Sequence, residues 1–544
     1  MKKILHNGIN PAAGSWQWGA RISGVFLVLG VIAAMILGLA ACGSPVGDAL
    51  VIPGEAALYA DPYELPDTPD PRLPESPTRA VDWQDDGTLR LSMRPPQTLN
   101  PLLNRDPSVA QILQLLFEPL AVLDENLRPV GHLASLEFSL DYTVVIVTIR
   151  NDTIWSDGLP VTADDLIFSV ETLRNAPHDA IYRRFVENIE DVARLNDRTA
   201  RISFVDAHPA VGYALLFPLI PRHYYLLETD PASLRNMMPV GNGPFLFEGM
   251  GQAVQLVRNA HTFRALPAFE RVEVLLLPDA QIDLYAFDRG LIDALRLPMP
   301  EWTRNPGATP VHGDDFPAMY FEHIGFNLER EIFHDIYVRQ GIAQLINASE
   351  IIETLYLHHA VRAATPIHPL SWKYDPAVQP LPYDPQRANM LLRDVPRDAY
   401  NPWQIIVGAD SPERVTIARR LADALNGFGI YVETHELPHD EFVTRLMGND
   451  FDLYVGWMEL CFAPDFAFLF PHDPVLEGLF AVTRFAATET AFLAAMGQLQ
   501  QAFIDQVPVV GLAFRHSSVL MHPRIIAGEA PAAGRPFLYV NRWR

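Results

Sequence analysis

One pair of histidines has the spacing of a catalytic metal site. His435 and His439 enclose Glu436 in the pattern H-E-x-x-H, in which two histidines one helical turn apart bind zinc and the glutamate acts as a base. That geometry needs a helix, but Pro438 lies inside the motif, where it costs a helix about 3 kcal/mol. The preceding residues, 430–434, alternate as a strand does. We therefore expect the motif at a strand end and keep a zinc hydrolase only as a remote alternative.

The other residues that could take part in catalysis or metal binding belong to no larger motif. Cys461 could act as a nucleophile or could be a small buried apolar side chain. His358 and His359 could bind a metal, but neighbouring side chains point in different directions, which favours a solvated or loop pair. The sequence has no phosphate-binding G-x-x-x-x-G-K-[ST] loop and no G-x-S-x-G nucleophile turn. We expect no catalytic residues, no metal and no cofactor.

The composition and charge of the chain limit the kinds of molecule that it can bind. The chain has 544 residues, is 49 % hydrophobic and carries a formal charge of −24 from 41 basic and 65 acidic side chains. This apolar content supports a folded core, which excludes general disorder. A strongly negative chain repels phosphates, so we expect no nucleic-acid partner. With only 2 cysteines, a disulfide framework is also excluded.

The first 41 residues have the pattern of an export signal. Lys2, Lys3 and Arg21 give a positive start, and 24–41 is an uninterrupted run of apolar or small residues. The run ends in the letters LAACG, which resemble the lipobox of bacterial lipoproteins. That resemblance implies cleavage before Cys42 and a lipid on its sulfur. A plain transmembrane anchor is the alternative, and both readings place the bulk of the protein outside the cytoplasmic membrane.

A spacer follows the export signal. Eight prolines stand among acidic and small residues between 43 and 86, a density that forbids helix and inner strand. We expect 42–86 to be an extended, acidic, lipid-anchored tether. It would hold a folded body near the membrane while leaving that body free to reach a partner.

From residue 89 onward, strand and helix patterns alternate irregularly, which is typical of a mixed α/β architecture with several lobes. Strands are expected over 89–93, 136–150 with a turn at 139–141, 272–277, 430–434, 451–455 and 509–514. Helices are expected over 106–116, from a cap at Thr162, and over 281–289, 337–346, 386–392, 414–426 and 488–504.

From Thr98 onward the chain resembles the family 5 solute-binding proteins of bacterial ABC importers, the peptide- and nickel-binding type. The shared motifs keep one order along the chain. They are TLNP at 98–101, LFEPL at 116–120, LDEN at 123–126, WSDG at 155–158, TADD at 162–165, GNGPF at 241–245, RN at 258–259, GLID at 290–293, FN at 326–327, VRQGIA at 338–343, YDP at 383–385 and GW at 456–457.

The resemblance implies a two-lobed periplasmic-binding-protein fold of type II, with an extra domain on the first lobe. By motif position, the first lobe takes three segments of the chain: 87–125, 201–308 and 506–544. The extra domain takes 126–200 and the second lobe takes 309–505. A hinge between the lobes would let them close on a ligand.

The function that the resemblance implies is capture of an oligopeptide or similar small solute and its delivery to an ABC permease and ATPase complex. The protein would act as a monomer at the extracytoplasmic face of the cell membrane, in the periplasm if an outer membrane exists. The segment 471–490 looks short for the family. A sensor or scaffold lipoprotein that kept the fold and changed its pocket is therefore the alternative.

The ligand residues depart from the family pattern after the Gly-Trp pair. Gly456 and Trp457 would lead into the pocket, where Trp457 could form a flat wall or pack in the core. Peptide-binding relatives place an Asp shortly afterwards to hold the peptide amino group, and that position is Leu460 here. Glu459 and Asp465 are the candidate replacements, with solvated surface positions as the other reading of each.

Overall fold

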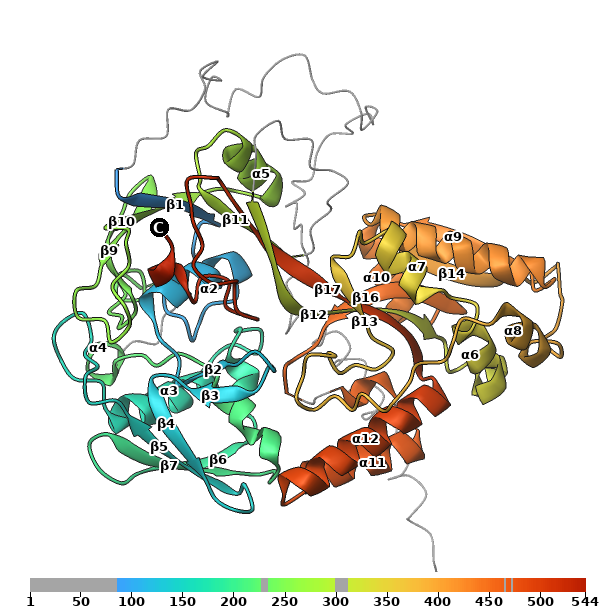
Figure 1. The fold of residues 1–544 in the computed structure, drawn as a ribbon, viewed down its shortest axis with the longest axis horizontal. Helices are drawn as coiled ribbons and strands as arrows, with labels where there is room; N and C mark the ends of the chain where they lie inside the picture. The colour runs from blue at the N-terminus through green and yellow to red at the C-terminus, as the bar shows by residue number, and fades with distance from the viewer. Residues whose placement is uncertain (1–85, 227–232, 299–311, 464–465, 471–472) are drawn as a thin grey trace, which may run out of the picture.

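The computed structural model describes residues 86–226, 233–298, 312–463, 466–470 and 473–544. The predictions for 1–41 and, except for its last residue, for 42–86 lie outside the described residues, as do Cys42 and Asp465. Two bodies of mixed helix and sheet are joined by the long strands β12 (His312–Phe326) and β17 (Val509–Met521) (Figure 1). Within the described residues, no helix combines the length and the apolarity needed to cross a bilayer.

The first body is built on a four-stranded sheet. In spatial order its strands are β1 (Thr88–Met93), β10 (Arg271–Leu276), β9 (Ala253–Arg258) and β8 (Phe245–Met250). β1 buries alternate side chains, Leu89 and Leu91, as its alternation predicts. Helix α2 (Pro107–Leu116) packs against β1 and β8, and Asp106 caps it by accepting the amides of Ser108 and Val109.

A second four-stranded sheet belongs to the same body. Its order is β4 (Ala134–Phe138), β5 (Val144–Ile149), β7 (Thr199–Phe204) and β6 (Ile189–Arg194). Helix α3 (Ala163–Asn175) lies against it and begins after Thr162, the predicted cap, which forms a capping box with Asp165. Smaller elements complete this body: β2 (Ala121–Leu123), β3 (Pro129–Gly131), η1 (Arg183–Val186), η2 (Pro209–Leu215), α4 (Arg222–Tyr225) and η6 (Val540–Arg542). One hydrophobic core joins both sheets.

A seven-stranded sheet runs from the first body into the second. Its order is β11 (Ala294–Leu297), β17, β12, β16 (Leu453–Glu459), β14 (Trp403–Gly408) and β15 (Val432–Leu437), with β13 (Ala360–Arg362) also paired to β17. The helix α5 (Ala280–Asp288) packs on β11. β12 and β17 are thus shared by both bodies, as expected of a hinge between two lobes.

Helices cover the sheet of the second body. They are η4 (Glu331–His334), α6 (Ile336–Ala343), α7 (Ala348–Thr354), α8 (Pro385–Leu391), α9 (Pro412–Gly427), α10 (His439–Met447), η5 (Ala467–Leu469), α11 (Pro474–Arg484) and α12 (Glu489–Gln506). α9 packs on β14, β15 and β16, while α11 and α12 form a pair that reaches back toward the first body (Figure 1).

Nearly all predicted elements are confirmed within a few residues, but the strands of the hinge differ. No strand was predicted over 312–326, and β17 continues to Met521 rather than ending at 514. Both strands pass from one core into another, so their buried side chains follow no single alternation. α9 ends at Gly427, as its sequence predicts, and the left-handed residue of the following turn is Gly429, which has a φ of +78°.

Candidate functional site

We assign the hinge to the first of two interruptions in the pairing of β12 and β17. The register shifts there between Phe316 and Tyr320, which marks an irregularity in the ladder, and it shifts again between Glu322 and His323. Phe316 lies in the core of the first body, whereas Ile324 on the same strand lies in the core of the second. A change of backbone angle at this irregularity would move one body relative to the other.

Asp315 ties this hinge to the second body. Its carboxylate lies 2.5 Å from His359 Nδ1 and 3.5 Å from His516 Nδ1, and it accepts the Ser518 hydroxyl. Burial alone would raise the pKa of Asp315, but hydrogen bonding from His516, Ser518 and His359 lowers it to about 2. The carboxylate therefore stays charged at neutral pH and holds both imidazoles.

The two bodies also contact each other away from the hinge. Arg484 of α11 pairs with Asp206 at 2.7 Å, and His208 stacks on Phe492 of α12 with ring centroids 5.7 Å apart. A hydrophobic cluster also crosses the boundary, since it contains Tyr213 of the first body and Phe492 of the second. The lobes are therefore in contact along this face.

A small cavity lies inside this boundary. Its volume of about 10 Å³ is close to what one water molecule needs. It is lined from the first body by Leu127 and Tyr213, and from the second by Met319, Pro366, Ile367, His368, Ser371, Lys373, Cys461, Phe462, Ala463 and Phe466. The segment 461–463 follows directly on β16, the strand from which the ligand residues were predicted.

Lys373 is the one cation in this lining. Its side chain is buried, its ammonium donates to the carbonyl of Phe462, and its Nζ lies 4.2 Å from the ring centroid of Tyr213. Burial lowers the pKa of Lys373 to about 7. A carbonyl and a ring face compensate a buried charge only in part.

His368 and Tyr213 complete the polar lining. His368 Nδ1 accepts the amide of Leu370 at 3.1 Å, which leaves the proton on Nε2, and Nε2 is buried without a partner among the described residues. The Tyr213 hydroxyl donates to the carbonyl of Leu127 at 2.5 Å and accepts from Trp372 Nε1 at 3.1 Å. Tyr213 is thus satisfied, and His368 is not.

The residues predicted from the Gly-Trp pair lie on β16 beside this cavity, but they do not line it. Gly456 is buried opposite His323 of β12. Trp457 lies edge-on to Tyr320 at 5.5 Å, on the face that carries the Arg414 ion pair. Glu459 is paired with Tyr320, and burial together with the charge of Glu459 raises the pKa of Tyr320 to about 12.

Leu460, for which the resemblance predicts the position of the family's Asp, is 5 % exposed and belongs to the hydrophobic cluster between the bodies. Its amide donates to the carbonyl of Met319 at 2.9 Å. Leu460 is therefore a packed apolar side chain of the boundary between the bodies.

The charged group beside Trp457 is a buried ion pair. Arg414 donates to both carboxylate oxygens of Glu322, each at 2.9 Å, and the guanidinium of Arg515 lies 3.9 Å from one of them. Glu322 is fully buried. Despite the burial of its guanidinium, the negative charge of Glu322 raises the pKa of Arg414. Every charge here has a partner.

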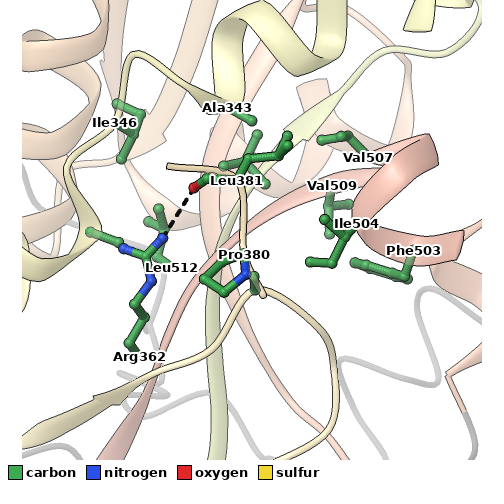
Figure 2. A pocket seen from close by; sticks show the side chains of 14 residues that line it. Ala343, Ile346, Arg362, Pro380, Leu381, Phe503, Ile504, Val507, Val509 and Leu512 are labelled. Carbon is green, nitrogen blue, oxygen red and sulfur yellow. Dashed lines mark hydrogen bonds between the residues drawn. The ribbon is translucent and has the colours of Figure 1, made fainter. Parts of the chain in front are cut away.

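A second cavity, of about 30 Å³, lies wholly within the second body (Figure 2). Its wall is apolar except for Arg362, which donates to the carbonyl of Leu381 at 3.4 Å. Phe503 and Ile504 close it from the end of α12. Because no residue of the first body reaches this cavity, lobe closure would not act on it.

The residues considered for catalysis or metal binding lie in separate elements of the fold. His435 and Glu436 lie in β15, Pro438 precedes α10, and His439 is the first residue of that helix, so the predicted strand-end position is confirmed. His358 is exposed, while its neighbour His359 belongs to the hinge. Cys461 is half-buried at the cavity. Within the described part of the chain, no group of three His, Cys, Asp or Glu side chains is arranged to hold a metal.

The sequence profile of the bacterial extracellular solute-binding proteins, family 5, matches residues 128–473. The chain belongs to this family.

Individual relatives of this family 5 chain are distant. It is 26 % identical over 353 residues to a Brucella ovis protein named as an ABC transporter peptide-binding protein, and that match covers 62 % of this chain and 66 % of the relative. The oligopeptide-binding protein AppA of Bacillus subtilis is 22 % identical, with 71 % of this chain and 76 % of AppA covered.

Solved structures extend the likeness over the whole fold. The substrate-binding protein CtaP of Listeria monocytogenes matches with a TM-score of 0.74 and 20 % identity, covering 85 % of this chain and 99 % of CtaP. NikZ of Campylobacter jejuni, solved with Ni(L-His), matches with a TM-score of 0.67 and 21 % identity, covering 84 % of this chain and 99 % of NikZ. These matches confirm the predicted two-lobed family 5 fold.

Two residues of the cavity were missed by sequence reasoning. Lys373 and His368 lie in the irregular segment between β13 and α8, where no periodic pattern indicates burial. One signal was available: Lys373 is the only lysine outside the first three residues of the chain.

Proposed function

We propose that this protein binds an oligopeptide or similar small solute between its two lobes and delivers it to an ABC permease and ATPase complex. One observation carries the proposal: the family 5 chain has a polar cavity at the boundary of two bodies that share the strands β12 and β17. The names of its relatives, which include peptide-binding and di/tripeptide-binding proteins, support the same class of ligand.

The mechanism follows from the hinge. A solute that contacts both lobes has a higher affinity for the closed arrangement than for the open one, and it shifts the population by that difference. The cavity contains groups from both bodies, Tyr213 on one side and Lys373 on the other, so it supplies such contacts. The permease would recognise the closed shape, and no catalytic group is required.

The residues predicted around β16 remain part of the proposal. We expect Gly456 and Trp457 to shape the approach to the cavity, and Glu459 or Asp465 to meet a positive group of the solute. Cys42 is proposed to carry the lipid that keeps a monomer at the extracytoplasmic face of the membrane, with 42–86 as its tether.

The direct test is a ligand screen on the full chain, purified in mild detergent. Pools of di- to pentapeptides and of metal chelates are added, and thermal unfolding is followed. A solute at 100 times its Kd stabilises the folded state by about 2.7 kcal/mol, so saturable stabilisation by one pool is expected.

Two variants, Glu459→Gln and Asp465→Asn, show which acid contributes to the affinity for a positive solute group. If no pool stabilises the chain and mass spectrometry finds no co-purified solute, the proposed function is wrong.

A further inference from the structure

The strand β17 passes from the second body into the first around His516. On one side of this residue Ala513 belongs to the core of the second body, and on the other side Val519 belongs to the core of the first. The pairing of β17 with β12 has the first of its two interruptions at the same place, between Phe316 and Tyr320 of β12. Motion of one lobe relative to the other would therefore bend β17 close to His516.

One side-chain contact spans this crossing point. On the first-body side, Asp315 of β12 lies opposite Ser518 of β17 and accepts its hydroxyl. On the second-body side, His359 immediately precedes β13, which pairs with β17 up to Arg515. His359 Nδ1 lies 2.5 Å from the Asp315 carboxylate, and the carbonyl of His359 accepts the amide of His516 at 3.0 Å. The contact thus joins a group held by one lobe to a group held by the other.

His359 follows a turn that few side chains favour. After helix α7, Leu357 has a φ of +48° and His358 has a φ of +68°, and neither residue is a glycine. Both side chains are exposed, so their packing does not select this left-handed backbone. The amide of His358 donates to the carbonyl of Ile352 at 3.0 Å and closes the turn. Two left-handed residues in a row are a source of backbone strain, and strain of this kind is common at switch regions.

The contact of Asp315 with His359 can break without leaving a buried charge. The two side chains are 27 % and 29 % exposed, so water can take the place of either partner when they separate. A carboxylate that accepts an imidazole N–H makes a charge-assisted bond, which is strong enough to favour one arrangement over another. The pair of Arg414 and Glu322, at 7 % and 0 % exposure, lacks this access to water and is permanent by comparison.

We propose that Asp315 and His359 form a latch across the hinge, which stabilises the arrangement in which the two lobes touch and releases when they part. The lobes touch in this structure, through Arg484 with Asp206 and through the cluster that contains Phe492, and the latch is engaged. Because a solute binds this arrangement more tightly, the latch raises solute affinity by raising the population of that arrangement. The effect on affinity rests on the proposed function, whereas the latch itself does not.

Hydrogen exchange followed by mass spectrometry, on the full chain in mild detergent, tests the latch without any ligand. The two segments compared are 460–463, at the lobe boundary, and the strand β5, inside the first body. His359→Leu removes the donor of the latch, and Asp315→Asn removes its charged acceptor. In each variant we expect exchange of 460–463 to become about 2- to 10-fold faster, the range of one hydrogen bond, while exchange of β5 stays unchanged.

Further variants separate the hydrogen bond from packing at this position. His358→Asn removes the neighbouring exposed imidazole and keeps a residue that tolerates a left-handed backbone, so its exchange should match the wild type. His359→Asn keeps an N–H donor close to the position of Nδ1 and should lie nearer to the wild type than His359→Leu does. The double variant of His359→Leu and Asp315→Asn should exchange no faster than the faster single variant, because both substitutions remove the same contact.

Unchanged exchange of 460–463 in His359→Leu and Asp315→Asn overturns the latch. An equal increase in β5 also overturns it, since that result means a general loss of stability, and so does an effect of His358→Asn as large as that of His359→Leu. If only one of the two latch variants folds, that variant decides; if neither folds, these residues support the fold and the latch is wrong.

The effect on affinity is measured by calorimetry with the solute that the screen selects. We expect this solute to bind His359→Leu about 2- to 10-fold more weakly than the wild type. Faster exchange of 460–463 with no solute found in the screen would support the latch and contradict the proposed function. Faster exchange with unchanged affinity would overturn the part of the inference that links the latch to binding.

Discussion

Two buried cations lie beside the same segment of chain and differ in one respect. Arg414 lies beside Trp457 of β16, with its guanidinium on both oxygens of Glu322. Lys373 lies beside Phe462, just past the end of β16, where it donates to a carbonyl, faces an aromatic ring and interacts electrostatically with Cys461. Both cations are buried, but within the described chain only Arg414 is paired with a carboxylate.

The difference separates a structural charge from one suited to a ligand. A buried ion pair with both partners present is complete in the folded protein, and removal of one partner is costly. A buried cation without an acid makes the folded state less stable than an apolar side chain would.

The largest loss of stability is expected at the buried ion pair of Arg414 and Glu322. Glu322→Gln leaves the Arg414 guanidinium buried without its countercharge, so the free energy of unfolding should fall by about 3–5 kcal/mol. Urea unfolding followed by circular dichroism measures it. Asp394→Asn, at an exposed pair with Arg393, is the control and should change little. A loss below about 1 kcal/mol for Glu322→Gln would remove the contrast between the two sites.

We expect the folded protein to lose stability at acidic pH because several of its histidines are buried. Burial lowers the pKa of His323 to about 4 and that of His368 to about 3, and His208 between the lobes also falls to about 4. Below pH 6.5 these histidines become protonated in the unfolded chain but stay neutral in the folded protein. The free energy of unfolding therefore falls as the pH drops from 6.5 toward 4.

Between pH 7 and pH 5.5 we expect a loss of roughly 2–4 kcal/mol, measured by urea unfolding at each pH. His368→Gln and His323→Gln should each reduce this loss. Constant stability across that range would mean that the histidines are not held uncharged.

Lys373→Met should act in the opposite direction from Glu322→Gln. Met fills a similar volume and removes a buried charge, so the free energy of unfolding should rise or stay within about 1 kcal/mol of the wild type. The same urea titration, made without added peptide, checks it. A loss above about 2 kcal/mol would show that Lys373 supports the fold, as Arg414 does.

The smallest change in stability is expected at the half-exposed ion pair that joins the two lobes. Arg484 is half exposed where it pairs with Asp206, and solvent screens such a pair. Arg484→Ala should lower the free energy of unfolding by less than about 1 kcal/mol, while small-angle scattering should show a larger radius if the pair helps to hold the lobes together. An unchanged radius would assign closure to the apolar cluster around Tyr213 and Phe492 instead.

Local patterns predicted the main helices and about half of the elements, but most strands, β6 to β9 among them, were not predicted. The helix cap at Thr162 and the alternation of β1 needed only neighbouring residues, and both are confirmed. β12 escaped prediction because its first half packs in one core and its second half in another, with Glu322 buried among apolar neighbours. Lys373 escaped for a related reason: its burial depends on Tyr213 and Phe462, which are distant in the sequence.

The most direct measurement is a crystal structure of the full chain with the peptide that the screen selects. We predict that the peptide lies between the two lobes and contacts Tyr213 of the first body together with Lys373 of the second. A peptide bound within one body alone, such as in the cavity beside Arg362 and Phe503, would contradict the proposed function.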